Sequence, residues 1–288
     1  DLALLALFAG LYSVPMYALI QMRSQPSHRS RIIAANNILN ALFMIASAVI
    51  AGALLKTGLT VPQLFLAVGI ANAVVATYIF LLVPEYLLRF VAWIATRLVY
   101  RFEVRGDEHI PVEGAAILVC NHVSFVDAVL LMAASPRPIR FVMDHSIFRI
   151  PVLGALFKLA KAIPIASRES DPATYEAAFA QARKVLDEGD LLCIFPEGAL
   201  TRDGALQTFK PGVMKILQTH PVPVVPIGLN NLWGSYFSRA EAGRAMVKPF
   251  RRGFLSRVGL SAGPAMAPAQ ATLEAMRQRV QSLLHTPA

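Results

Sequence analysis

The two side chains best suited to chemistry are His122 and Asp127, which lie five positions apart in the segment NHVSFVD. A histidine titrates near neutral pH and can accept the proton of a hydroxyl group. A carboxylate five residues further along can turn back and accept the other ring N–H, which fixes the tautomer and stabilises the imidazolium ion that forms. No serine nucleophile is needed if the substrate supplies the attacking hydroxyl. The pair therefore predicts base catalysis in which a hydroxyl of the substrate is the nucleophile.

The same segment also has a purely structural interpretation. Ser124 and Asp127 have the spacing of a capping box, in which Asp127 would serve only the start of a helix. One histidine and one aspartate at a fixed spacing form a weak motif, because such a pair arises easily by chance. From these residues alone both interpretations stay open.

A second motif, FPEG, occupies residues 195–198 and follows the apolar run LLCIF. Gly198 permits a tight turn there. A carboxylate at Glu197 could hold a substrate hydroxyl or orient a loop, and an exposed turn residue is the alternative. Two cysteines, Cys120 and Cys193, lie in apolar runs, which indicates buried thiols in a reducing compartment. No Cys/His spacing suggests a metal site.

These motifs need elements that bring them together. From residue 101 onward, apolar runs alternate with helical patterns, which predicts an α/β fold with a mostly parallel sheet flanked by helices. We expect strands at 115–120, 139–143, 162–165, 191–195 and 222–229, and helices at 127–134, 151–161, 172–188 and 210–219. Sites in such sheets lie at the carboxyl ends of the strands. His122 and Glu197 both follow predicted strands, so the two motifs should meet at that edge.

The two motifs together resemble the signature of the phospholipid/glycerol acyltransferase family over roughly residues 90–265. Two further segments resemble conserved blocks of that family: IPI at 163–165, followed by Arg168, resembles the second block, and VPVVPI at 222–227 resembles the fourth. The resemblance implies a glycerolipid acyltransferase-like fold in which His122 is the general base and Asp127 orients it. It implies an acyl thioester of CoA or acyl carrier protein as co-substrate, with no cofactor and no metal. The acceptor would be the hydroxyl of a glycerol-based lipid.

Beyond the pair, we expect contacts with the substrates from further polar, charged and turn residues. These are Asn121, Ser124, Arg168, Glu197, Gly198, Arg202 and Lys210. The three basic residues among them are candidates for phosphate contacts, because charged donors bind phosphate oxygens strongly.

Two departures from the family pattern concern phosphate binding. In relatives that act on lysophosphatidic acid, FPEG is followed by Thr-Arg-Ser, and that arginine binds the phosphate. Here Ala199 and Leu200 follow, and Arg202 comes two positions later. The arginine of the second block is also one residue late, because Ser167 occupies its usual place. The shifts favour a phosphodiester lysophospholipid as acceptor, with 1-acylglycerol 3-phosphate as the alternative. The segments GALTRDGALQTFKPG and NNLWGSYFSR (230–239) resemble 2-acylglycerophosphoethanolamine acyltransferases.

The composition predicts an integral membrane protein. The chain of 288 residues is 56% hydrophobic and only 16% charged, whereas about 25% is usual for soluble proteins. The net charge is +9, and no feature indicates a nucleic-acid partner. Residues 2–20, 32–55 and 57–84 carry no charged side chain, which predicts three transmembrane helices within a first domain at 1–84. The lipid bilayer is therefore an expected partner.

The basic residues predict the orientation. The loop after the first predicted span, QMRSQPSHRSR, and the stretch after the third span are rich in arginine, whereas the remaining loop holds only Lys56. Positive loops face the cytoplasm. We therefore expect a multi-pass protein of the inner (plasma) membrane with its catalytic domain, residues 101–288, on the cytoplasmic face. Between them, residues 85–100 mix aromatic side chains with arginine, which favours an interfacial linker helix over a buried core helix.

The first domain also suggests a function of another class. GLYSVPMYALIQMRS and AANNILNALFM resemble the last helices of a major facilitator superfamily transporter of the lysophospholipid-importing kind. A component of a lysophospholipid transporter is therefore an alternative. A pseudoenzyme that binds head groups is disfavoured by the intact His, Asp and Glu. A hydrolase is disfavoured because no Gly-x-Ser-x-Gly elbow is present.

Overall fold

The computed structural model of the chain describes residues 2–25, 27–82, 84–151, 153–235, 237–238 and 255–284. The chain folds into two compact units, Asp1–Tyr78 and Ile79–Ala288. Tyr236 and Arg239 of the segment at 230–239 lie outside the described residues.

Long apolar helices make up the first unit: α1 (Leu2–Arg23), α2 (Arg29–Lys56) and the greater part of α3 (Val61–Leu82). Among the described residues, two helices are long and apolar enough to cross a membrane, Arg29–Lys56 and Val61–Tyr78. Their large side chains stay exposed, as at Phe43 (70%) and Met44 (71%). Exposed apolar surface of this extent marks a site of contact with lipid or protein, so these helices fit association with a membrane.

A polar contact joins the first two helices. Asn40 of α2 donates a 2.7 Å hydrogen bond from Nδ2 to the hydroxyl oxygen of Tyr17 in α1. Polar side chains in apolar helices commonly hydrogen-bond across helices in this way, with a net gain of about 1 kcal/mol. This asparagine therefore has a structural partner.

The second unit is built on one seven-stranded sheet in the order β1-β7-β6-β2-β5-β3-β4. Five strands are parallel to one another: β2 (Ala116–Cys120), β3 (Ile139–Asp144), β4 (Ile163–Ile165), β5 (Leu191–Ile194) and β6 (Val224–Asn230). The remaining two, β7 (Ser256–Ala262) and β1 (Tyr100–Arg105), run the opposite way, because β7 pairs antiparallel with β6 and parallel with β1. The mostly parallel sheet predicted from the sequence is confirmed.

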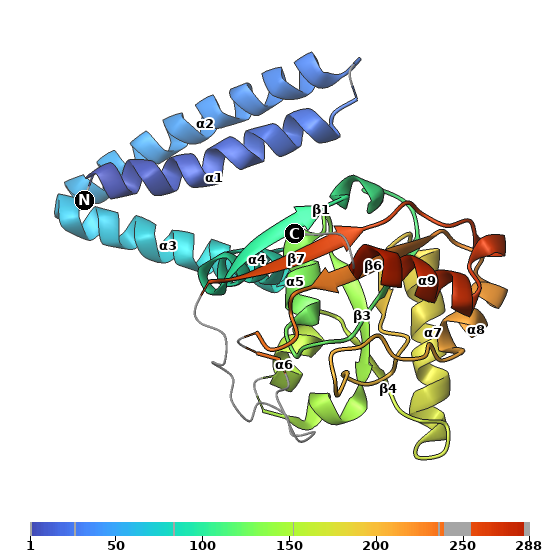
Figure 1. Ribbon diagram of the computed structural model, residues 1–288. Helices are drawn as coiled ribbons and strands as arrows, with labels where there is room; N and C mark the ends of the chain where they lie inside the picture. Colours follow the sequence, from blue (N-terminus) through green and yellow to red (C-terminus); the bar gives the residue numbers. More distant parts are fainter. Residues whose placement is uncertain are drawn as a thin grey trace. The chain divides into compact units, whose positions relative to one another are not determined.

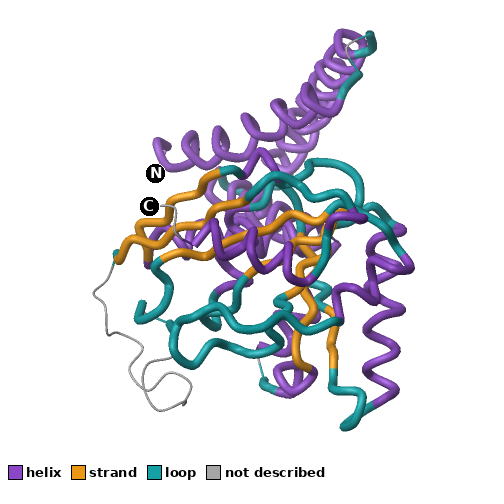
Figure 2. Tube along the Cα trace, turned by 45° about the vertical axis from the view of Figure 1, so that its right-hand side comes forward, coloured by secondary structure: helices purple, strands orange, loops and turns teal. Residues whose placement is uncertain are grey.

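Helices cover both faces of the sheet (Figures 1 and 2). On one face lie α5 (Asp127–Ala134) and, packed against α5 and β1, α4 (Pro84–Val99). The other face is covered by α7 (Pro172–Asp187), α8 (Gly212–Thr219) and α9 (Leu273–Leu284). Alternate residues of β2 serve the two cores: Leu118 packs with the α5 side, and Ile117 and Val119 pack with the α7 side. The short helix α6 (Leu153–Leu159) lies between β3 and β4 in the chain.

Local chemistry explains the ends of α7. Asp171 accepts a 3.0 Å hydrogen bond from the backbone N–H of Thr174, and Pro172 occupies the first turn. The helix stops before Gly189, whose φ is +80°. The predicted start of this helix is confirmed. Two other helices are shorter than predicted: α8 begins at Gly212 rather than residue 210, because Pro211 lies at its N-cap, and α6 ends at Leu159.

Candidate active site

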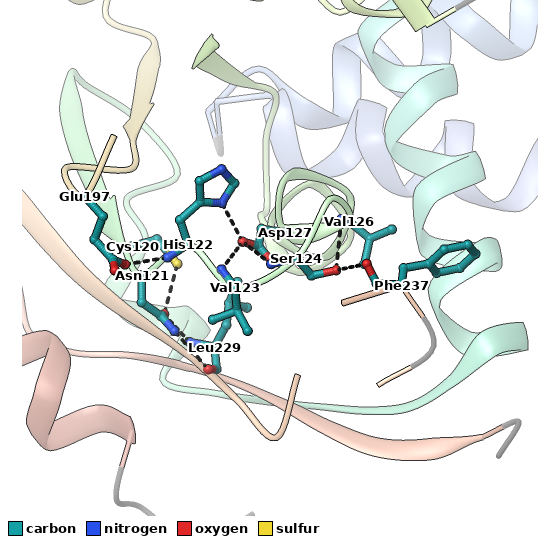
Figure 3. Close-up of polar contacts among 10 residues, drawn as sticks. All are labelled: Cys120, Asn121, His122, Val123, Ser124, Val126, Asp127, Glu197, Leu229 and Phe237. Atoms are coloured by element: carbon teal, nitrogen blue, oxygen red, sulfur yellow. Dashed lines mark hydrogen bonds and ion pairs between the residues drawn. The ribbon is translucent and has the colours of Figure 1, made fainter. Parts of the chain in front are cut away.

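His122 and Asp127 are in direct contact at the carboxyl edge of the parallel strands (Figure 3). Nδ1 of His122 lies 2.7 Å from Oδ2 of Asp127. The histidine follows the end of β2 and the aspartate opens α5, so the intervening residues form the turn that brings them together. The histidine side chain is 25% exposed and that of the aspartate 1%. A buried carboxylate therefore holds an imidazole that is open on its other side.

Asp127 has further partners in the same turn. Its Oδ2 also accepts a 2.7 Å hydrogen bond from the main-chain N–H of Val123, and both carboxylate oxygens accept from that of Ser124 at 3.0 Å. The aspartate thus stabilises the turn and holds the imidazole at once. The alternative in which it serves only the helix start is wrong.

The second ring nitrogen of His122 faces away from Asp127 in Figure 3. In the described part of the chain, no hydrogen-bond partner is found for Nε2. The imidazole stacks on the ring of Phe195, with centroids 4.3 Å apart and planes 20° from parallel. Two fixed contacts therefore define the ring plane and leave Nε2 free to accept a proton. This role of Phe195 was not predicted, because the contact joins distant parts of the chain.

Glu197 is 5% exposed and uses both carboxylate oxygens inside the protein. Oε1 accepts a 2.7 Å hydrogen bond from the main-chain N–H of His122, and Oε2 accepts one of the same length from that of Gln207. Burial raises the pKa of Glu197, although these two hydrogen bonds act in the opposite direction. The expected contact with a substrate hydroxyl is not favoured by this geometry. The carboxylate instead positions the backbone of His122.

Asn121 and Ser124, both expected to contact substrate, are buried and bonded to the protein. The Asn121 amide accepts from the main-chain N–H of Leu229 at 2.7 Å and donates to the carbonyl of the same residue at 3.2 Å. Ser124 donates its hydroxyl to the carbonyl of Phe237 at 2.9 Å. These two side chains tie the motif to β6 and to the segment that follows it, so the geometry gives them structural roles.

Gly198 and Lys210 lie against each other beside the FPEG turn. Gly198 has a φ of +69°, which a glycine adopts without strain. A Cβ at this position would come within 2.7 Å of Nζ of Lys210. The main-chain N–H of Lys210 donates to the carbonyl of Pro196 at 2.8 Å. The turn therefore presents an ammonium group next to the motif, and Lys210 is exposed.

The two candidate arginines differ in their distance from the base. The main-chain N–H of Thr201 donates to the carbonyl of His122 at 2.9 Å, so the next residue, the exposed Arg202, lies close to the pair. Arg168 is also exposed but follows β4, which is three strands away from β2 in the sheet. At about 4.8 Å per strand, that separation is roughly 14 Å. By this backbone placement, Arg202 lies nearer to His122 than Arg168 does.

Neither cysteine takes part in this site. Cys120 and Cys193 are free and fully buried, as expected from the sequence, and burial raises the pKa of both thiols. Thiols held in the neutral form are poor nucleophiles. Among the described residues, no group of three or more His, Cys, Asp or Glu side chains is placed to hold a metal ion.

Comparison with known proteins agrees with this arrangement. Residues 101–230, which carry both motifs, match the model of the family described as Acyltransferase. This part of the chain is similar to members of that family. The α/β unit also shares its fold with the crystal structure of the 1-acyl-sn-glycerophosphate acyltransferase PlsC from Thermotoga maritima. The TM-score is 0.54 at 21% identity, over 69% of this chain and 77% of that one.

Curated relatives of the domain have related names. A chloroplastic 1-acyl-sn-glycerol-3-phosphate acyltransferase of Brassica napus is 30% identical over 131 residues, which is 45% of this chain and 37% of the relative. Enzymes of the same name from Limnanthes douglasii (36% over 127 residues; 43% of each chain) and Borreliella burgdorferi (30% over 128 residues; 44% of this chain and 50% of the relative) are similar. The chain thus spans half or less of the length of these relatives.

Proposed function

We propose that the protein is an O-acyltransferase that moves a fatty acyl group from a thioester to the free hydroxyl of a glycerol-based phospholipid precursor. The observation that carries this proposal is the 2.7 Å contact between His122 and Asp127, in a region similar to the acyltransferase family. The free Nε2 atom at the carboxyl edge of the sheet is placed where an incoming hydroxyl could reach it.

In the proposed reaction, Nε2 of His122 accepts the proton of the acceptor hydroxyl as its oxygen attacks the thioester carbonyl. Asp127 accepts the hydrogen bond from Nδ1 and stabilises the imidazolium ion that results. Collapse of the tetrahedral intermediate breaks the carbon–sulfur bond, and the imidazolium returns its proton to the departing thiolate. Base catalysis of this kind contributes about 10²–10⁴-fold, and positioning of the two substrates contributes up to about 7–11 kcal/mol. The donor would be an acyl thioester of CoA or of acyl carrier protein.

The names of the relatives support 1-acylglycerol 3-phosphate as the acceptor. Several curated relatives carry that substrate in their names. Arg202 and Lys210 supply two exposed positive charges near His122, which suits a dianionic phosphate. The product would be a phosphatidic acid. This preference replaces the phosphodiester acceptor as the leading proposal.

A phosphodiester lysophospholipid remains the second candidate because of one observation. The two positions directly after FPEG hold Ala199 and Leu200, neither of which can bind phosphate through its side chain. The nearest arginine comes later in the loop, at Arg202. A head group with one negative charge on its phosphate needs fewer positive partners, and such a loop would accommodate it.

A panel of lysolipids that differ only in head group would separate the two candidates. The purified full chain would be supplied with acyl-CoA or acyl carrier protein thioesters, and His122→Ala would serve as the inactive control. Faster transfer to 1-acylglycerol 3-phosphate than to lysophosphatidylethanolamine supports the first acceptor, and the reverse order supports the second. Transfer to neither, with intact donor thioester, would contradict the proposed activity.

We also propose a multi-pass placement in the inner membrane, with the acyltransferase domain on the cytoplasmic face, where both donors occur. Its support is the two apolar helices together with the arginine-rich loops. Transport of lysophospholipid stays an alternative for the helical unit. It predicts lysolipid flux that persists in the His122→Ala variant, whereas acyl transfer would not.

A further inference from the structure

The loop after FPEG contains a tight turn, from Thr201 to Ala205, that is closed by its own hydrogen bonds. The hydroxyl of Thr201, a residue that is 1% exposed, donates to the carbonyl of Ala205 at 2.9 Å and accepts from the main-chain N–H of Gly204 at 3.0 Å. Oδ1 of Asp203 accepts a 3.0 Å hydrogen bond from the N–H of Ala205. We call these residues the loop turn. The exposed Arg202 belongs to it, so the place of this arginine depends on what holds the turn.

Two hydrogen bonds attach the loop turn to the site. The main-chain N–H of Thr201 donates to the carbonyl of His122 at 2.9 Å. Two residues beyond the turn, the N–H of Gln207 donates to the carboxylate of Glu197 at 2.7 Å. Two points of attachment define an axis, and a turn held at two points can still rotate about it. A third contact is therefore needed to fix the place of Arg202 relative to the base.

The indole ring of Trp233 makes that third contact. A Cβ at Gly204 would come within 2.7 Å of Cγ and 2.8 Å of Cδ1 of Trp233, so the ring lies directly against the glycine backbone. Gly204 has a φ of +87°, a conformation that glycine adopts without strain. The tryptophan is half-buried and packs against the core on the α5 side of the sheet. A ring anchored in the core thus presses on the loop turn.

The contact between Trp233 and Gly204 spans the place where the base stands. Trp233 follows β6 and the loop turn follows β5, whereas β2 lies between these two strands in the sheet. His122 follows the carboxyl end of β2. The loops that leave the two neighbouring strands therefore meet beside the histidine, and the tryptophan joins them.

The segment that carries Trp233 is fixed on both sides of the ring. Leu232, directly before it, is 1% exposed and belongs to the core. Further along, the carbonyl of Phe237 accepts a 2.9 Å hydrogen bond from the hydroxyl of Ser124 (Figure 3), and Ser238 forms an antiparallel bridge with Ser124. The same segment thus touches the turn that holds Asp127 and the turn that holds Arg202.

We propose that Trp233 is a positioning residue, whose ring holds the loop turn in place and so keeps Arg202 where it can bind the phosphate of the lipid acceptor. Tryptophan suits this role because its ring is large, rigid and mostly apolar. A binding group that is already ordered loses less conformational freedom when the substrate arrives. The inference deepens the proposed function and rests on it, because the acceptor that Arg202 would bind is the proposed one.

Limited proteolysis with trypsin tests the contact without any measurement of activity. In the full chain, Trp233→Ala should speed cleavage between Arg202 and Asp203 about tenfold, because the loop turn opens more often. Cleavage between Arg168 and Glu169 is the matched control, since this exposed arginine also precedes an acidic residue but lies on the β4 side of the sheet. Its rate should not change. Mass spectrometry of the peptides measures both rates.

Two further variants complete this experiment. Trp233→Phe keeps a ring at the position and should be cleaved more slowly than Trp233→Ala. Gly204→Ala disturbs the same contact from the other side, because its new Cβ has no room beside the indole, and it should also speed cleavage after Arg202. It tests the proposal even if Trp233→Ala does not fold. Unchanged cleavage after Arg202, or equal acceleration after Arg168, would overturn the proposal.

Steady-state kinetics test the consequence for the acceptor. Trp233→Ala should raise the KM of the phosphate-bearing acceptor about tenfold, with little change in kcat or in the KM of the acyl thioester. The same substitution made in the Arg202→Ala variant should raise that KM no further, because the ring acts through the arginine. Equal increases in both backgrounds would overturn the proposal. If the chain transfers no acyl group at all, the proposed function fails, and proteolysis still decides whether Trp233 holds the loop turn.

Discussion

The main-chain N–H of His122 donates a 2.7 Å hydrogen bond to Oε1 of Glu197, a residue 75 positions away in the sequence. The two motifs are thus joined by the backbone of the base itself. Position, rather than a direct contact with substrate, is what the glutamate contributes. The histidine ring is then held by Asp127 on one side and by Phe195 on its face.

Replacement of the base should separate activity from stability. His122→Ala should lower kcat/KM by about 10²–10⁴-fold or more, because it removes the ring nitrogen that would accept the hydroxyl proton. The melting temperature should change little, since the ring is partly exposed. Acyl transfer and thermal unfolding of the same preparation check both parts. Turnover within tenfold of the wild type would contradict the assignment of the base.

Asp127→Asn should cost both activity and stability. The amide cannot stabilise the imidazolium ion, so kcat should fall by about 10²–10⁴-fold. The asparagine also turns an NH₂ group toward main-chain N–H groups that now donate hydrogen bonds to the carboxylate. The loss of these hydrogen bonds should lower the free energy of unfolding by about 1–3 kcal/mol. The His122→Ala variant is the matched comparison, because it lacks the second effect. Equal melting temperatures of the two variants would show that the turn does not depend on the carboxylate.

Glu197→Gln tests the positioning role. The amide keeps the size of the side chain but presents an NH₂ group to one of the two main-chain donors, from His122 or Gln207. Displacement of the base should lower kcat by about tenfold to a hundredfold, with little change in the KM of the acceptor. Steady-state kinetics over a range of acceptor concentrations separate the two constants. A rise in KM at unchanged kcat would instead indicate direct binding of substrate.

The same variant should reveal the raised pKa of Glu197. In the unfolded chain a glutamate loses its proton near the ordinary value of 4.5, whereas the buried group retains it to higher pH. The folded state then binds more protons across that window, so the stability of the wild type relative to Glu197→Gln should fall as the pH rises from about 4. Melting temperatures of both proteins at several pH values measure the difference. If the melting temperature of the wild type rose relative to that of Glu197→Gln as the pH increased, the pKa of Glu197 would be lowered and not raised.

Arg202 and Arg168 form a matched pair for head-group binding. Arg202→Ala should raise the KM of the phosphate-bearing acceptor by about tenfold to a hundredfold, as loss of a charge-assisted hydrogen bond of about 1.5–3 kcal/mol predicts. Arg168→Ala should have a smaller effect on the acceptor, because that residue follows β4, three strands from β2. Kinetics with the head-group panel check both. The reverse order would move the phosphate site to the β3–β4 side of the sheet.

The sequence predicted those helices and strands whose limits are set by neighbouring residues in the chain. The start of α7 follows from Asp171 and Pro172, and the five parallel strands follow from short apolar runs such as that ending at Cys120. The reversed strands β1 and β7 were not predicted. YRFEVR alternates charged and apolar residues and is half exposed, and its pairing with β7 joins segments more than 150 residues apart.

The candidate site divides in the same way. The His122–Asp127 contact was readable because the turn is local. The main-chain roles of Glu197, Asn121 and Ser124 were not, since each depends on a partner from a distant segment. Polar residues of one motif look alike in sequence whether they face a substrate or the backbone of a neighbouring strand.

Two backbone donors attach the loop after FPEG to the site. The N–H of Thr201 donates to the carbonyl of His122, and the N–H of Gln207 donates to the carboxylate of Glu197. Every amino acid except proline supplies such a donor. Exposed side chains within the stretch from 199 to 206, such as Arg202, can therefore vary between homologues while these two backbone attachments are retained. Under the proposed function, sequence changes in this loop would alter the choice of lipid acceptor without disturbing the contact between His122 and Asp127.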